Sequence, residues 1–134
     1  MLKFTDGCSF IGAFDRGVKT FGVFFWPNKL TYTGQFVNGD ITGFGQRGYE
    51  TGWYSGHFRS GHRHDYGTLH WTDGSSYEGN WVYNMRSGDG LYTFADGIIY
   101  QGQFDQDMPH GDGEFVYPNG IRLEGMFVKG QKHG

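Results

Sequence analysis

Residues 77–99 read YEGNWVYNMRSGDGLYTFADGII, and this stretch decides the fold. Tyr77, Gly79 and Trp81 stand two residues apart, which places them on one face of a β-strand, while Glu78 and Asn80 face the other way. A second alternating run follows after a polar turn. An Asp-Gly dipeptide, which tolerates the positive φ of a tight turn, comes near the end of the stretch. We therefore predict that these residues form a β-hairpin.

The same pattern recurs through the chain every 22 or 23 residues. Each copy has an aromatic or apolar residue, then Gly two positions later and Phe or Trp four positions later. The copies are Phe10/Gly12/Phe14, Tyr32/Gly34/Phe36, Tyr54/Gly56/Phe58, Tyr77/Gly79/Trp81, Tyr100/Gly102/Phe104 and Leu123/Gly125/Phe127. A fixed period of this size is typical of repeat arrays. We predict one domain over residues 1–134, with units starting near 10, 32, 54, 77, 100 and 123 and a half unit at 2–9.

Each predicted strand carries a glycine at its centre, where glycine ordinarily weakens a strand. Because aromatic residues flank this glycine on the same face, we expect it to leave space for a ring of the adjoining strand. The sheet is then free to curl toward that face. Without helical periodicity between the strands, the predicted fold class is all-β: a single-layer, elongated and curved antiparallel meander of tandem β-hairpins.

The two faces of the predicted ribbon differ in chemistry. One face is polar, and we expect it to meet water; its residues are Thr33, Gln35, Ser55, His57, Glu78, Asn80, Gln101 and Gln103. The concave face is aromatic, and no residues remain in the chain to form a second layer over it, so we expect a partner to cover it. The second unit is predicted to be the most irregular, because Arg47 stands where other units have Tyr92 or Phe115.

Composition and charge exclude several classes of function. The chain has 134 residues, with 25 Gly, 13 Phe, 9 Tyr and 4 Trp, and a formal charge of −3. This balance disfavours binding to nucleic acid and to anionic membranes. The chain has one cysteine, Cys8, which cannot form an internal disulfide, and no long apolar run. We expect a cytoplasmic protein.

Three other kinds of site are weighed and set aside. The histidines invite a metal-site interpretation, but His64, His110 and His133 share one repeat position and are explained as turn residues. The Gly-x-Gly pairs do not follow a strand and open a helix, as a nucleotide-binding loop would. No nucleophile, base and orienting group are brought together. The sequence thus indicates no enzyme, no catalytic residue, no metal ion and no cofactor.

The run from Tyr77 to Trp81, followed by the Gly-rich segment 88–97, strongly resembles the MORN repeat, the membrane occupation and recognition nexus motif. The resemblance covers nearly the whole chain, with about five full units and partial units at both ends. It implies an elongated β-hairpin array that serves as an adaptor or scaffold of the cytoskeletal, ciliary or membrane-junction type. It also implies that partner peptides, phosphoinositides or a second copy are candidate ligands.

Our main functional hypothesis is a protein-interaction module whose concave aromatic groove receives an extended or helical segment of a partner protein. We expect most rings to stabilise the array and the outermost second-strand rings also to line the groove. The predicted anchors are Phe24, Trp26, Leu69, Trp71, Tyr92, Phe94, Phe115 and Tyr117, framed by Tyr32, Tyr54, Tyr77 and Tyr100.

Two alternatives stay open at the level of sequence. The first is a phosphoinositide or membrane-surface module, suggested by basic residues assigned to turns: Arg16, Lys19, Arg59, Arg63 and Arg86. The second is a homodimer, because an open meander ends in strands with unpaired backbone groups. A cytoskeletal or ciliary location is expected for the main hypothesis.

Overall fold

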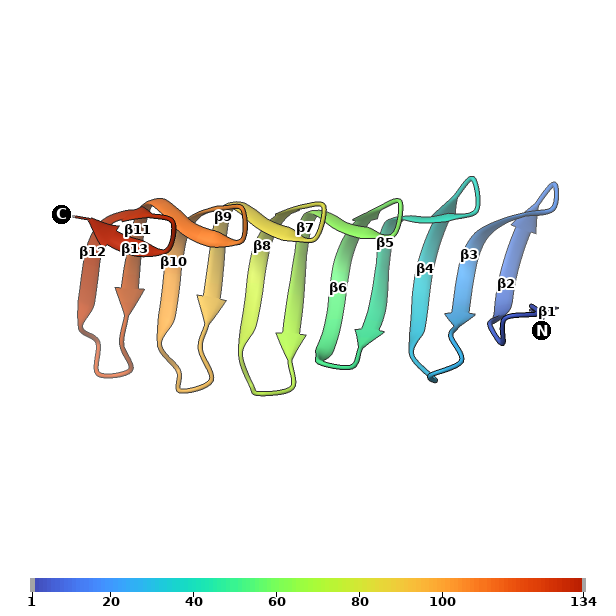
Figure 1. The fold of residues 1–134 in the computed structure, drawn as a ribbon, viewed down its shortest axis with the longest axis horizontal. Helices are drawn as coiled ribbons and strands as arrows, with labels where there is room; N and C mark the ends of the chain where they lie inside the picture. Colours follow the sequence, from blue (N-terminus) through green and yellow to red (C-terminus); the bar gives the residue numbers. More distant parts are fainter. Residues whose placement is uncertain (1, 134) are drawn as a thin grey trace.

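The fold is a single antiparallel sheet in which every strand pairs with its neighbours in sequence (Figure 1). It is seen in a computed structural model that describes residues 2–133. The thirteen strands are β1 (Leu2–Lys3), β2 (Ser9–Asp15), β3 (Val18–Phe25), β4 (Thr31–Val37), β5 (Asp40–Tyr49), β6 (Gly52–Arg59), β7 (His62–Trp71), β8 (Ser76–Val82), β9 (Met85–Thr93), β10 (Ile99–Asp105), β11 (Met108–Val116), β12 (Arg122–Val128) and β13 (Gln131–His133). The predicted fold class is confirmed.

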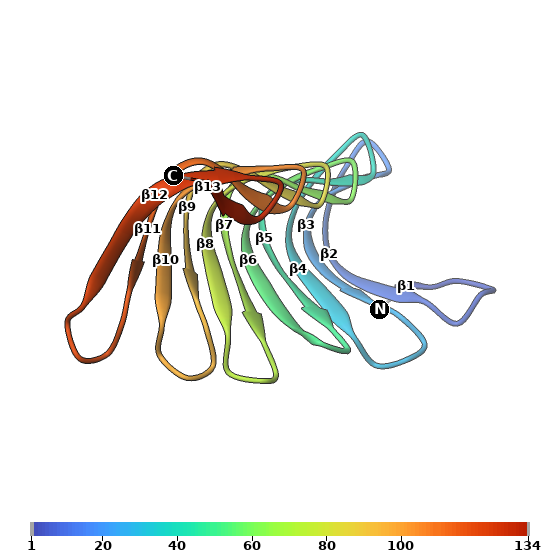
Figure 2. The ribbon, with the colours of Figure 1, turned by 60° about the vertical axis from the view of Figure 1, so that its left-hand side comes forward.

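The sheet is not flat. In Figure 2 each hairpin bends part-way along its length, so that one set of turns curls over the same face of the ribbon. These curled ends are the short turns between β2 and β3, β4 and β5, and each later pair up to β12 and β13. The curl makes this face concave, as the strand glycines predicted.

The short turns owe their shape to two consecutive residues with positive φ. Examples are Asn38 (φ 52°) with Gly39 (φ 85°), and Tyr83 (φ 44°) with Asn84 (φ 71°). Positive φ at both central residues defines the type I′ turn, whose twist matches that of the flanking strands. The second residue of a turn also bonds to the preceding hairpin, as where the Asn84 N–H donates to the Arg63 carbonyl at 2.9 Å. The curled turns are therefore tied to one another along the array.

The turns at the other edge of the ribbon use a different device. An Asp or Asn side chain accepts a hydrogen bond from the backbone N–H two residues later, as Asp96 does from Ile98 at 3.1 Å. Asp6, Asn28, Asp73 and Asn119 make the same contact. The turn between β5 and β6 lacks it, because the second unit is one residue shorter there. The predicted irregularity is thus confined to this turn, since the pairing Tyr32–Arg47–Tyr54 continues unbroken.

The core is a continuous ladder of aromatic rings on the concave face. Neighbouring rings meet edge to face, with centroids 5.0–5.7 Å apart. In order along the array the rings are Phe10, Phe36, Tyr32, Phe58, Tyr54, Trp81, Tyr77, Phe104, Tyr100 and Phe127. All ten are at most 5% exposed. Each unit therefore completes its core with a ring from the next unit, as expected for a repeat protein.

The strand glycines make room for this ladder. A Cβ atom on Gly67 would lie 1.9 Å from the Tyr54 hydroxyl oxygen, and one on Gly90 would lie 2.3 Å from that of Tyr77. No side chain fits there, so each tyrosine ring lies directly over the glycine of the following strand. The predicted space for a neighbouring ring is confirmed.

Candidate interaction groove

The first-strand rings are covered by the chain itself, which corrects one expectation. Tyr32, Tyr54, Tyr77 and Tyr100 are at most 1% exposed, and Leu69 is 5% exposed. Because the hairpins bend around them, these side chains need no partner to bury them. They belong to the core, and the prediction that they frame or line an accessible groove is wrong for this structure.

The buried tyrosines also satisfy their own hydroxyl groups. Each hydroxyl donates to the backbone carbonyl three residues later; Tyr77 donates to Asn80 at 2.9 Å and Tyr32 to Gln35 at 2.7 Å. Burial disfavours the phenolate form, which raises the pKa of Tyr32 to about 12 and also raises the pKa of Tyr54, Tyr77 and Tyr100. All four hydroxyl groups therefore remain neutral at physiological pH and serve the fold.

The second-strand side chains remain open to a ligand. Phe24, Trp26, Trp71, Tyr92, Phe115 and Tyr117 are half-buried, and Phe94 is 39% exposed. Ring contacts join most of them in pairs, with centroid distances of 5.0 Å for Phe24–Trp26, 5.6 Å for Trp71–Tyr92 and 4.7 Å for Tyr92–Phe94. These seven side chains lie at concave-face positions of the second strands and the turns that follow.

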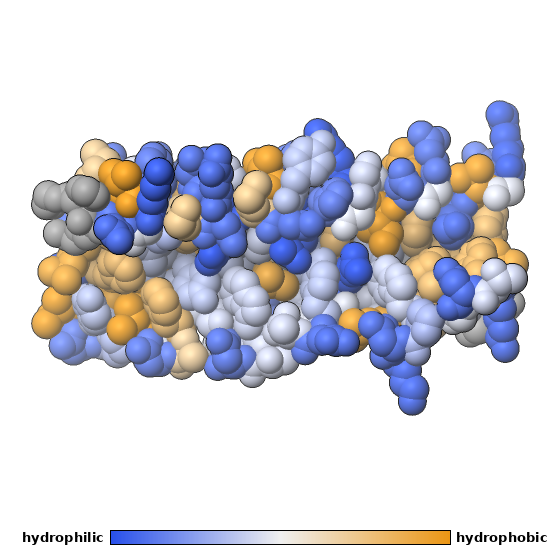
Figure 3. All heavy atoms as spheres, in the orientation of Figure 1, coloured by the Kyte–Doolittle hydropathy of each residue, from blue (hydrophilic) through white to orange (hydrophobic). Residues whose placement is uncertain are grey.

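Three hollows follow one another along the concave face, between the curled turns and the second-strand rings. Phe24, Trp26 and Arg47 line the first, of about 390 Å³. Arg63, Trp71 and Trp81 line the second, of about 220 Å³, and Arg86, Tyr92 and Phe115 line the third, of about 230 Å³. In Figure 3 a pale band runs lengthwise below hydrophilic side chains at the upper margin. We call the three hollows together the groove.

Three arginines cross the groove, and the sequence hypothesis did not include them among its anchors. The Arg47 guanidinium lies over the Trp26 ring at 4.4 Å and the Tyr49 ring at 4.8 Å. The Arg63 guanidinium lies over Trp81 at 4.7 Å and over the same Tyr49 ring at 5.2 Å. The repeat alignment could have predicted their place. Arg47 occupies the repeat position at which other units have a groove ring, and Arg63 and Arg86 occupy one repeat position in their units.

The structure also corrects the expected place of the basic residues. Of the five that were assigned to turns, only Arg16 lies in a turn. Lys19, Arg63 and Arg86 lie in β3, β7 and β9 and line the groove, and Arg59 ends β6. The argument for a membrane-binding row of turn residues loses its geometric basis.

The outer face is less uniformly polar than expected. The eight polar residues predicted there are exposed or half-buried. Four large rings that the sequence hypothesis missed stand among them and are about half exposed: Phe21, Phe44, Trp53 and Tyr66. Trp53 stacks on His70 with centroids 4.3 Å apart. The alternation along each strand could have predicted their place on the outer face, since each is adjacent in sequence to a residue that faces the concave side.

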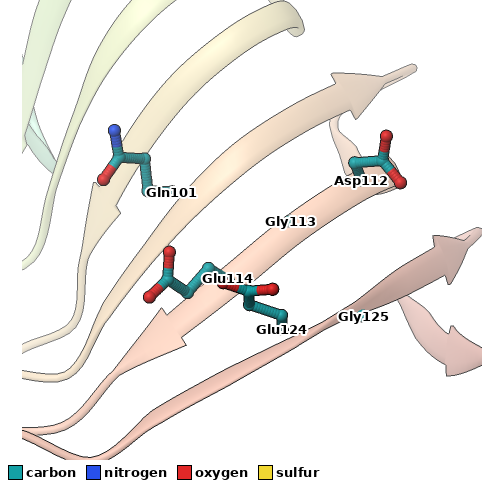
Figure 4. Close-up of a pocket in the computed structure, with 6 residues that line it drawn as sticks. All are labelled: Gln101, Asp112, Gly113, Glu114, Glu124 and Gly125. Carbon is teal, nitrogen blue, oxygen red and sulfur yellow. The ribbon is translucent and has the colours of Figure 1, made fainter.

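Hollows of about 560 and 610 Å³ also occur on the outer face, over the C-terminal half of the array. Figure 4 shows the first of these, where Gln101, Asp112, Glu114 and Glu124 project from neighbouring strands. Strand glycines form the remaining wall. Among residues 2–133, carboxylates, an amide and glycines line this hollow, without an aromatic or aliphatic side chain, so it offers no ring or aliphatic anchor for a protein segment.

One of the histidines weighed as metal ligands has a role in the fold. Within residues 2–133 no three His, Cys, Asp or Glu side chains come together as metal ligands. His64 is buried, and its Nδ1 accepts a hydrogen bond from the Tyr83 N–H at 3.2 Å, which is a role in the fold. Over the same range, no helix has the length and apolarity required to cross a bilayer.

Comparison with known families matches the hairpins one by one. The MORN repeat model matches residues 32–53, 54–76, 77–99, 100–122 and 124–134. The chain belongs to the MORN-repeat family. MORN repeats are generally protein- or membrane-interaction modules and form a non-catalytic repeat fold. The hairpin of β2 and β3 continues the same geometry one unit before the first match. Comparison with curated proteins gave no match.

Proposed function

We propose that this MORN array is a scaffold or adaptor module whose groove binds a segment of a partner protein. The observation that carries the proposal is the difference between the two sets of rings on the concave face. The first-strand rings are buried by the chain itself, whereas the second-strand rings remain half-buried beside three consecutive hollows. Half-buried aromatic side chains in such hollows are typical anchors of protein interfaces.

The geometry favours a segment that runs along the array. The hollows lie side by side across successive strands, so a ligand that fills all three must cross the strands. Burying one ring of this size contributes about 1.5–3 kcal/mol before the ordering costs of binding. Contacts with several of the rings are thus sufficient for a specific interaction.

The proposal includes a cytoplasmic setting with a cytoskeletal or ciliary partner. It is supported by the family membership and by Cys8, which is buried and has no disulfide partner among the described residues. Microscopy of a fluorescent fusion tests the location, and an exclusively extracellular or organelle-lumen signal would contradict it.

Site-specific photo-crosslinking tests the groove itself. A photoreactive phenylalanine replaces Phe94 in the groove or Gln101 on the outer face, and the captured partner is identified by mass spectrometry. We expect capture from position 94 only, and we expect Tyr92→Ala to abolish it while Trp53→Ala on the outer face does not. Capture from position 101 that depends on Trp53 would overturn the proposal.

A further inference from the structure

The charges of the groove differ from those of the rest of the chain. Four cationic side chains line its hollows, namely Lys19, Arg47, Arg63 and Arg86, whereas two carboxylates do so, those of Asp40 and Asp107. The whole chain carries a formal charge of −3. The outer-face hollows are lined by Glu78 and Asp89 and by Asp112, Glu114 and Glu124. On this face Arg122 pairs with Glu114, to which its Nη1 donates at 2.9 Å. The groove lining is therefore net positive, whereas the lining of the outer-face hollows is net negative.

Arg86 and the other two arginines have different environments. Arg86 is neutralised within the fold, because its Nε donates to the Asp107 carboxylate at 2.6 Å and its Nη2 to the Asp107 carbonyl at 2.6 Å. No carboxylate of the described residues lies within 4 Å of Arg47 or Arg63. Among the described residues, the Arg63 guanidinium donates one hydrogen bond, to the Asn84 carbonyl at 3.2 Å, and the Arg47 guanidinium donates none.

The two unpaired guanidinium groups both lie close to one ring, that of Tyr49, at 4.8 and 5.2 Å from its centroid. Their Nε atoms are shielded from solvent and have no acceptor among residues 2–133. Two like charges held near one ring repel each other, and a buried donor without an acceptor is costly. Carboxylates that bind the two guanidinium groups from the groove offset the repulsion.

On the basis of the proposed groove function, we propose that the partner segment is acidic, with Asp or Glu side chains that pair with Arg47 and Arg63 and apolar side chains that fill the hollows. The distance from β3 to β9 is about 29 Å at ordinary strand spacing, which about nine residues of extended chain cover. A planar guanidinium binds a carboxylate through two parallel hydrogen bonds, so the pairing also fixes the register of the segment.

A protein segment fits this arrangement better than a lipid surface does. The cations line the hollows of the concave face, and the guanidinium groups of Arg47 and Arg63 lie over aromatic rings. A bilayer is flat over this distance and meets projecting cations, whereas a single extended chain enters a narrow trough. Vesicles that contain phosphoinositide are accordingly a competitor in the test.

Fluorescence anisotropy with three dye-labelled peptides of about twelve residues tests the inference. The first peptide alternates Glu with Leu and Phe, and in the other two Gln or Lys replaces every Glu. We expect the Glu peptide to bind about tenfold more tightly than the Gln peptide, and the Lys peptide to bind more weakly still. We expect Arg47→Gln or Arg63→Gln to remove most of this difference, and the outer-face control Arg122→Gln to preserve it.

The outcomes separate the two proposals. Equal binding of the Glu and Gln peptides that is lost in Tyr92→Ala would overturn the acidic partner and leave the groove function standing. Binding that survives Tyr92→Ala but is lost in Trp53→Ala would overturn both. Failure of all three peptides, or displacement of the Glu peptide by phosphoinositide vesicles but not by an unlabelled copy, would overturn the acidic protein segment. Unchanged folding of each variant is checked by circular dichroism.

Discussion

The first and second strands of each hairpin share the concave face but have different roles. In the first strands of the four central units, the leading residue is always Tyr, and it is at most 1% exposed. The second-strand residue directly opposite varies from unit to unit: it is Arg47, Leu69, Tyr92 or Phe115. The same register position thus holds one buried ring type on the first strands and a variable residue on the second strands. That residue is buried at Leu69 and half-buried in the other three units.

This difference shows how a repeat array separates stability from recognition. The tyrosine ring over the strand glycine is packed on both sides by other rings of the ladder. Its site therefore accepts a side chain of one shape. The opposite position has the groove on one side, so its side chain is free to match a ligand. Arg47 is charged, whereas the residues at this position in the later units are apolar or aromatic. Packing alone therefore explains Arg47 less well than it explains the others.

The largest expected effect separates two tyrosines that pair across β8 and β9. Tyr77→Ala removes a buried ring of the ladder and is expected to lower the free energy of unfolding by about 3–5 kcal/mol. Tyr92→Ala removes a half-buried ring and is expected to cost about 1–2 kcal/mol, because its site is partly open already. Urea denaturation followed by circular dichroism measures both. Equal losses would contradict the division between core and groove.

A second comparison uses two strand glycines. Gly67→Ala places a Cβ atom 1.9 Å from the Tyr54 hydroxyl oxygen, so the ring must move, and we expect a loss of about 2–3 kcal/mol. Gly48→Ala is the control, because its Cβ would meet no heavy atom closer than 3.9 Å. Thermal unfolding should show a clearly lower Tm for the first variant only. A silent Gly67→Ala would mean that the ladder is loosely packed.

The core tyrosines also predict how stability depends on pH. Below about pH 10 a tyrosine is protonated in both the folded and the unfolded chain, so its full contribution is present. As the pH rises from 10 toward the folded-state pKa, which is about 12 for Tyr32, the unfolded chain loses the proton first and stability falls. The slope is about 1.4 kcal/mol per pH unit for each such tyrosine.

Tyr77→Phe tests this alkaline loss at one position. It is expected to cost about 1 kcal/mol at neutral pH, since the Asn80 carbonyl loses its hydrogen bond, and to make the decline above pH 10 shallower. Denaturant titrations at several pH values, with tyrosinate absorbance as a second signal, give the two slopes. Identical slopes for the variant and the parent protein would show that Tyr77 does not ionise on unfolding in this range.

The smallest effect on stability is expected at Arg47. Arg47→Tyr restores the ring found at Tyr92 and removes one of the two cations around Tyr49, so the free energy of unfolding should change by less than about 1 kcal/mol. The affinity for the acidic peptide should nevertheless fall about tenfold. A variant that unfolds much more easily would assign Arg47 to the core instead.

Local rules were sufficient to predict most of the fold from the sequence. The period, the alternation and the strand glycines indicate hairpins, ring-over-glycine packing and the curl. The covering of the aromatic face was missed because it depends on how sharply each hairpin bends. The groove charge was missed because Arg63 was read as a turn residue, whereas its place depends on the bulge between Gly56 and Phe58.

The four tryptophans provide the most direct test of the central claim that ligands occupy the concave side of the second strands. Trp26 and Trp71 border the groove as half-buried rings, Trp81 is a buried core ring that also lines the second hollow, and Trp53 stands on the outer face. Their indole N–H signals can be followed by NMR while the acidic peptide is added. The account predicts that the signals of Trp26 and Trp71 shift and that the Trp53 signal stays in place. A shift of Trp53 with unchanged signals for Trp26 and Trp71 would contradict it.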